Sequence, residues 1–109
     1  MPASVTVLYP NEADAKYDFD YYVNSHMPMA AAQWKSSGCT GWSATKYQPT
    51  PDGKQPKYSF AGILVFESID AVHKALASAE TAAVMQDVPN YSNKQPEIMI
   101  GEDAKTVAA

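Results

Sequence analysis

Residues 18–29 read DFDYYVNSHMPM, and this stretch decides how the first helix of the fold is built. Side chains three and four positions apart share one face of a helix, and at that spacing His26 lies on the apolar face with Tyr22. Pro28 has no N–H to give to the carbonyl of Asn24, and its ring crowds that turn. The sequence therefore predicts a helix that kinks or restarts near His26 and turns the imidazole inward.

A lone inward histidine has two interpretations. It can be a structural residue, satisfied by a neighbouring carbonyl or tyrosine hydroxyl, as buried polar groups usually are. It can also be a neutral imidazole in a low-dielectric cleft, which is the usual group for proton transfer near neutral pH. The proline and Tyr22, one turn upstream of His26, favour the second interpretation.

The remaining elements follow from alternation, turn residues and caps. Strands are predicted at residues 5–9, 40–48, 58–67 and 97–100, and helices follow the N-caps Asp18 and Ser68, with a short extra helix at 80–88. The order is β-α-β-β-α-β, which indicates an α+β fold with an antiparallel sheet. Residues 58–67 are apolar on both faces, so the face away from the helices needs a further cover, and a second copy of the chain is the simplest one.

Tyr22, His26 and Pro28 also form a motif, and the segment resembles the EthD family, named for ethyl tert-butyl ether degradation. That family carries an aromatic-rich first helix with a Tyr-x-x-x-His step and a proline soon after it. The likeness extends through the order of elements over about residues 4–103, within a single domain 1–109. It implies a ferredoxin-like protomer paired as a dimeric α/β barrel, with His26 as the leading site residue and a role in catabolic or oxidative degradation.

Composition excludes several classes of function. At 109 residues the chain forms one domain, and its net charge of -4, without a basic stripe, argues against nucleic acid as a partner. No apolar run is long enough to span a bilayer, and the start lacks the pattern of a signal peptide, so we expect a cytoplasmic protein without a membrane partner. Cys39 is the single cysteine and is expected to be a small residue at the start of a strand.

The candidate pocket is apolar and aromatic. An inward His26 is expected to meet strand side chains, and the residues assigned to the pocket beside Tyr22 and His26 are Tyr9, Phe19, Met27, Trp42 and Phe60. This lining suits a small, hydrophobic, oxygen-bearing ligand. The pocket can lie in the barrel or between helix and sheet within one protomer. No metal or cofactor is expected, because the spacings typical of zinc, dinucleotide and phosphate sites are absent.

Three functions remain open. The first is cofactor-independent proton transfer by a lyase, dehydratase or isomerase, in which His26 acts as acid or base and Tyr22 donates a hydrogen bond to a substrate oxygen. The second is a cofactor-independent monooxygenase or a redox-linked accessory protein in the oxidation of ethers or aromatics. The third is a module that holds an apolar compound without turnover.

Overall fold

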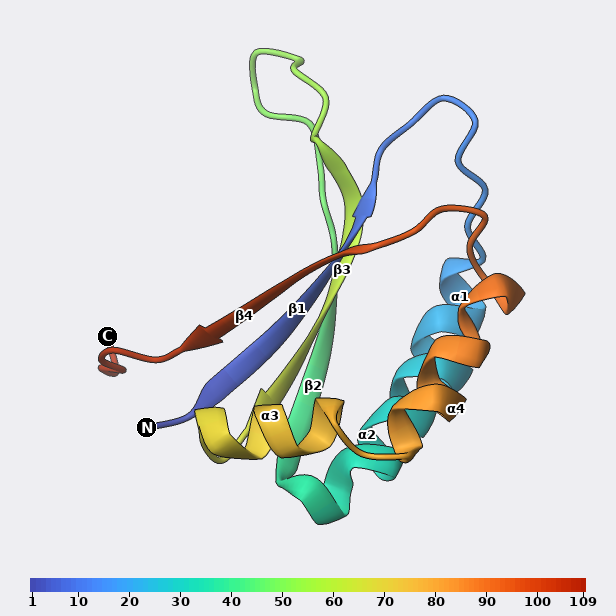
Figure 1. Cartoon of the computed structure of the whole chain (residues 1–109). Coiled ribbons are helices and arrows are strands. Elements are labelled where there is room, and N and C mark those ends of the chain that lie inside the picture. Colours follow the sequence, from blue (N-terminus) through green and yellow to red (C-terminus); the bar gives the residue numbers. More distant parts are fainter.

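The computed structural model describes residues 1–109 as a four-stranded antiparallel sheet with its helices on one side (Figure 1). The strands are β1 (Ala3–Pro10), β2 (Cys39–Lys46), β3 (Tyr58–Phe66) and β4 (Glu97–Glu102), in the spatial order β2-β3-β1-β4. The helices are α1 (Phe19–Tyr21), α2 (Met27–Trp34), α3 (Ile69–Leu76) and α4 (Glu80–Gln86), with a π-helical turn η1 (Tyr22–His26) and 3-10 turns η2 (Lys35–Ser37) and η3 (Val88–Asn90). The predicted α+β class and the ferredoxin-like order of elements are confirmed.

The first helical segment runs from α1 through η1 into α2, and its break lies where Pro28 predicts it. Asp18 caps the start, because its carboxylate accepts the N–H of Tyr21 at 3.0 Å. The N–H of Met27 bonds back to the carbonyl of Tyr22, five residues earlier, so the helix widens by one residue in the turn before Pro28. Single π turns of this kind are frequent at functional sites. Here the turn contains both Tyr22 and His26.

The sheet buries one face against the helices. In the β1–β3 pair, Val5 lies opposite Leu64 and Tyr9 lies opposite Phe60, and all four side chains are buried. Directly opposed residues project on the same side of a sheet, so the aromatic and aliphatic pairs form one continuous apolar layer. This layer and the inner faces of the helices make up the core.

The second helical region is divided into α3 and α4, and α4 lies within the short helix predicted at 80–88. Ser68 caps α3 as predicted and accepts the N–H of Ala71 at 3.1 Å. The hydroxyls of Ser78 and Thr81 both donate to the carbonyl of Ala75, at 2.6 Å and 2.9 Å. These side-chain bonds replace the next backbone bonds of the helix, so α3 ends at Leu76 and α4 begins in a new direction. None of the helices has the length and apolarity needed to cross a membrane.

Candidate functional site

His26 lies at the end of the π turn and is 4% exposed. Its Nδ1 is 2.9 Å from Oδ2 of Asp87, the C-cap residue that follows helix α4. The other carboxylate oxygen of Asp87 accepts the hydroxyl of Tyr21 at 2.6 Å and the side-chain amide of Asn90 at 2.9 Å. The carboxylate is therefore held from three directions, and it in turn fixes the plane of the imidazole.

These contacts decide which groups carry protons. Burial disfavours the ionised carboxylate, but the hydrogen bonds from Tyr21, Asn90 and His26 outweigh it and hold the pKa of Asp87 below its ordinary value. Burial lowers the pKa of His26 below its ordinary value, against the opposing effect of Asp87. Near neutral pH the pair is a carboxylate and a neutral imidazole. Since an ionised carboxylate only accepts, the imidazole proton is on Nδ1 and Nε2 is a hydrogen-bond acceptor.

Two tyrosines continue the network from Nε2. The hydroxyl of Tyr91 lies 3.2 Å from Nε2 of His26 and also contacts the hydroxyl of Tyr9. With Nε2 unprotonated, Tyr91 donates to His26, and Tyr9 must then donate to Tyr91. Tyr91 is held in place by the N–H of Asp18, which donates to its carbonyl at 2.9 Å. Burial raises the pKa of both phenols, so both keep their protons.

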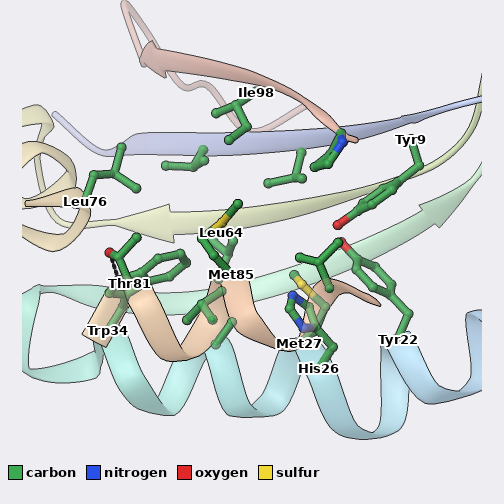
Figure 2. Close-up of a pocket in the computed structure, with 16 residues that line it drawn as sticks. Tyr9, Tyr22, His26, Met27, Trp34, Leu64, Leu76, Thr81, Met85 and Ile98 are labelled. Atoms are coloured by element: carbon green, nitrogen blue, oxygen red, sulfur yellow. Dashed lines mark hydrogen bonds between the residues drawn. The ribbon is translucent and has the colours of Figure 1, made fainter. Parts of the chain in front are cut away.

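A cavity of about 110 Å³ lies between the first helical segment, α4 and the sheet (Figure 2). His26, Tyr9 and Tyr22 lie at one end of it, and the other lining side chains are almost all apolar. At the rim, Met85 of α4 is 43% exposed and Ile98 of β4 is 49% exposed. The residues that line the cavity are Val5, Val7, Tyr9, Tyr22, His26, Met27, Ala30, Trp34, Leu64, Leu76, Thr81, Val84, Met85, Val88, Pro96 and Ile98.

Tyr22 is the unusual polar group of this cavity. Its side chain is 1% exposed, and its hydroxyl is a buried side-chain polar atom without a hydrogen-bond partner. Burial first, and then the proximity of Tyr9, raises the pKa of this phenol, so it is a donor and not a base. The hydroxyl fits against the sheet because residue 62 is glycine: a Cβ there would lie 2.0 Å from it. Figure 2 shows the hydroxyls of Tyr9 and Tyr22 turned toward each other.

The residues predicted from the sequence are only partly brought together. Tyr9, Tyr22 and Met27 line the cavity with His26. Phe60 stacks on Tyr9 behind the cavity wall, with ring centroids 4.5 Å apart. Phe19 packs edge-on against Phe60 and is also outside the cavity. Trp42, on the edge strand β2, is 37% exposed and does not line it.

Sequence reasoning did not find Asp87 or Tyr91. Asp87 ends a short helix and Tyr91 follows η3, in a stretch expected to be a loop, so neither belongs to a local motif. The Asp-x-x-Asn spacing of Asp87 and Asn90 is the only sequence signal, and it is common in turns. The residues His, Cys, Asp and Glu form no cluster of three that could hold a metal ion.

The comparisons with known proteins agree with this architecture. The family model described as the EthD domain matches residues 11–95. An EthD-like protein from Ralstonia eutropha JMP134 superposes with a TM-score of 0.86 at 25% identity, over 98% of this chain and 96% of the other. An ethyl tert-butyl ether degradation family protein from Bacillus halodurans C-125 gives a TM-score of 0.71 at 23% identity, over 94% and 99%.

A more distant likeness links the chain to an oxygenase. SnoaB of Streptomyces nogalater, described as a cofactor-independent oxygenase, gives a TM-score of 0.63 at 16% identity, over 99% of this chain and 97% of that one. At this identity the likeness shows the fold alone. No curated protein matches the sequence. Because the family model covers most of the chain, from before the first helix to just before the last strand, the protein belongs to the EthD family.

Proposed function

We propose that this protein binds a small apolar compound carrying an oxygen atom in the cavity between the first helical segment and the sheet, and that His26 exchanges a proton with it. The observation that carries this proposal is the position of His26 at the cavity wall, with Asp87 bonded to the nitrogen on its far side. Membership of the EthD family supports a role in small-molecule binding or degradation. The nature of the lining favours an apolar ligand with one polar end.

The size of the cavity restricts the ligand. An engineered apolar cavity of about 150 Å³ binds benzene, so a space of about 110 Å³ accepts a single ring once the rim side chains move slightly. Met85 and Ile98 at the rim are half exposed and are free to make that adjustment. A larger compound would extend past them toward the open edge of β4.

The electrostatics favour acid–base chemistry. A neutral imidazole with a carboxylate on Nδ1 can accept a proton on Nε2, and the carboxylate then stabilises the imidazolium that forms. Burial alone would prevent that charge, since it lowers the pKa of His26. Asp87 acts in the opposite direction and keeps the imidazole usable near neutral pH.

Nuclear magnetic resonance in deuterated buffer tests both parts of this proposal. A panel of small alcohols, phenols and enolisable ketones is screened for saturation transfer from the protein, which reports binding, and for exchange of carbon-bound protons, which reports proton transfer. We expect both signals with the natural protein, loss of exchange in His26→Asn, and full exchange in the control His73→Asn on the exposed side of α3. Binding without any exchange would contradict the acid–base role and support a ligand-holding module. Absence of binding would contradict the whole proposal.

A second candidate is oxidation without a cofactor, and its support is the fold shared with SnoaB. The same panel, incubated with the protein in a sealed cell with an oxygen electrode, separates the two reactions. Oxygen uptake that depends on ligand and protein would favour the oxygenase. Proton exchange at constant oxygen would favour the first proposal.

We also propose that the chain works as a homodimer, paired through the sheet face opposite the helices. On that face Ile63 is half-buried, Val65 is 36% exposed and Met99 is 62% exposed. Ile63 and Met99 both lie opposite Thr6 of β1, and Val65 lies opposite Ser4. These side chains therefore project from the side of the sheet that the helices leave open (Figure 1). Packing two such faces together would remove this apolar surface from water and form a barrel.

A further inference from the structure

We infer that the polar end of the cavity recognises a hydroxyl group, from an alcohol, a phenol or an enol, and passes its proton to His26 through Tyr9 and Tyr91. This inference rests on the proposed function and specifies its ligand and its proton path. It differs from direct contact between ligand and imidazole, because Nε2 of His26 is already occupied by the hydroxyl of Tyr91. The two phenols at the cavity wall, Tyr9 and Tyr22, are then the groups that meet the ligand.

The direction of each hydrogen bond follows from the carboxylate at the far end. Asp87 accepts three donors, so the His26 proton is on Nδ1, Tyr91 donates to Nε2, and Tyr9 donates to Tyr91. Each phenol has one proton, so the proton of Tyr9 is used in this chain. What Tyr9 offers to the cavity is the acceptor side of its oxygen.

Tyr22 presents a hydrogen-bond donor to the cavity, whereas Tyr9 presents an acceptor. The Tyr22 hydroxyl makes no hydrogen bond in the structure, although the side chain is fully buried and the hydroxyl faces the oxygen of Tyr9 (Figure 2). A buried polar group without a partner normally costs free energy, which indicates that its partner is supplied by a ligand. The third hydroxyl of the lining, that of Thr81, is satisfied, since it donates to Ala75 and accepts from Trp34 at 3.2 Å.

The cavity therefore ends in one acceptor, the oxygen of Tyr9, and one donor, the O–H of Tyr22. A hydroxyl group complements both, because it donates one hydrogen bond and accepts another. A ketone or an ether can accept from Tyr22 but leaves Tyr9 without a donor. Gly62 is part of this arrangement, since the space that its missing side chain leaves is taken by the Tyr22 hydroxyl.

The same geometry gives a balanced proton transfer. The ligand O–H proton moves to the oxygen of Tyr9, the Tyr9 proton moves to Tyr91, and the Tyr91 proton moves to Nε2 of His26. The products are a ligand oxyanion that accepts from Tyr22 and an imidazolium that faces Asp87. Asp87 also lines a surface groove with Asn90. The series of hydrogen bonds from Tyr9 to Asp87 therefore connects the buried cavity to the solvent side of the helices.

Three ring compounds of similar size test the recognition step: cyclohexanol, cyclohexanone and methylcyclohexane. We expect the natural protein to bind the alcohol about five- to ten-fold more tightly than the ketone, the effect of one neutral hydrogen bond on Kd. In Tyr22→Phe we expect both oxygen compounds to weaken several-fold while methylcyclohexane is unchanged. In Tyr91→Phe the Tyr9 proton is released into the cavity, so two donors face the ligand and the preference should reverse toward the ketone.

Dissociation constants come from ligand-detected nuclear magnetic resonance, with circular dichroism as the check that each variant is folded. A ketone bound as tightly as the alcohol by the natural protein would overturn the inference and leave the proposed function standing. An alcohol preference that persists in folded Tyr91→Phe would overturn the assigned direction of the hydrogen bonds. If none of the three rings binds, the proposed cavity site fails and the inference fails with it.

Discussion

Replacing Gly62 with alanine tests the packing that places the Tyr22 hydroxyl at the end of the cavity. The added Cβ would lie 2.0 Å from the hydroxyl oxygen of Tyr22, and 3.0 Å from Cε of Met27. The thioether of Met27 is flexible and can move, but Tyr22 is held among buried rings. Overpacking of this kind costs about 1–3 kcal/mol, and the lower entropy of the unfolded alanine chain returns about 0.4–1 kcal/mol. We expect Gly62→Ala to lower the free energy of unfolding by about 1–2 kcal/mol.

A double-mutant cycle separates this collision from a general weakness of strand β3. In Tyr22→Phe the colliding oxygen is gone, so Gly62→Ala should cost little in that background, and the coupling should be about 1–2 kcal/mol. Gly41→Ala is the matched control, since a Cβ there meets no atom within 4 Å. Urea unfolding at pH 7, followed by tyrosine and tryptophan fluorescence, gives each value. Additive effects of the two substitutions would refute the reasoning, because they would show that the hydroxyl does not occupy the space above Gly62.

Further predictions concern the network and the sheet. Tyr22→Phe alone should leave the free energy of unfolding unchanged or raise it by about 1 kcal/mol, because the hydroxyl has no partner to lose; a clear loss in urea unfolding would mean that it is satisfied. The natural protein should lose stability as the pH falls below 6.5, the ordinary pKa of histidine, because the unfolded chain protonates before the buried imidazole; His26→Asn should flatten the curve of urea midpoint against pH in this interval. Asp87→Asn should lower the pKa of His26 further, since the hydrogen bond and charge of Asp87 raise it, and a titration by nuclear magnetic resonance would show the shift. Val65→Asp should convert a dimer to monomers in analytical ultracentrifugation, whereas Ala32→Asp on the helix side should not; a monomeric natural protein would contradict the proposed pairing.

Much of the fold can be predicted because the signals are local. The caps Asp18 and Ser68 and the proline at position 28 each act within one turn of their own position, and the structure has the helix starts and the π turn where these residues place them. The separate short helix at 80–88 is predicted as well, but the position of the break, directly after Leu76, is not. The hydroxyls of Ser78 and Thr81 converge on the carbonyl of Ala75 only after the chain has turned. In the sequence, serine and threonine within a helical pattern do not mark the residue at which the helix ends.

The same distinction between local signals and tertiary contacts applies to the candidate site. His26 and Tyr22 lie on one helix face, and their spacing alone predicts that they point the same way. Sequence alone does not fix the register of the strands, and Trp42, which is predicted to line the pocket, lies on the edge strand β2 opposite Leu64 and outside the cavity. Asp87 carries only the Asp-x-x-Asn spacing with Asn90, which is common in turns and does not indicate a site.

The reason lies in how the network is assembled. Asp87 approaches His26 only because α3 ends early and α4 turns back along the first helical segment (Figure 1). Tyr91 reaches Nε2 only because the loop after η3 is tied to the N-terminus of α1 through the Asp18 N–H. Each contact therefore depends on a tertiary arrangement that no local sequence pattern predicts. Sequence alone presents His26 as an isolated imidazole, with only Pro28 and Tyr22 to favour proton transfer over a structural role. The carboxylate on one nitrogen and the phenol chain on the other make proton transfer the better supported of the two.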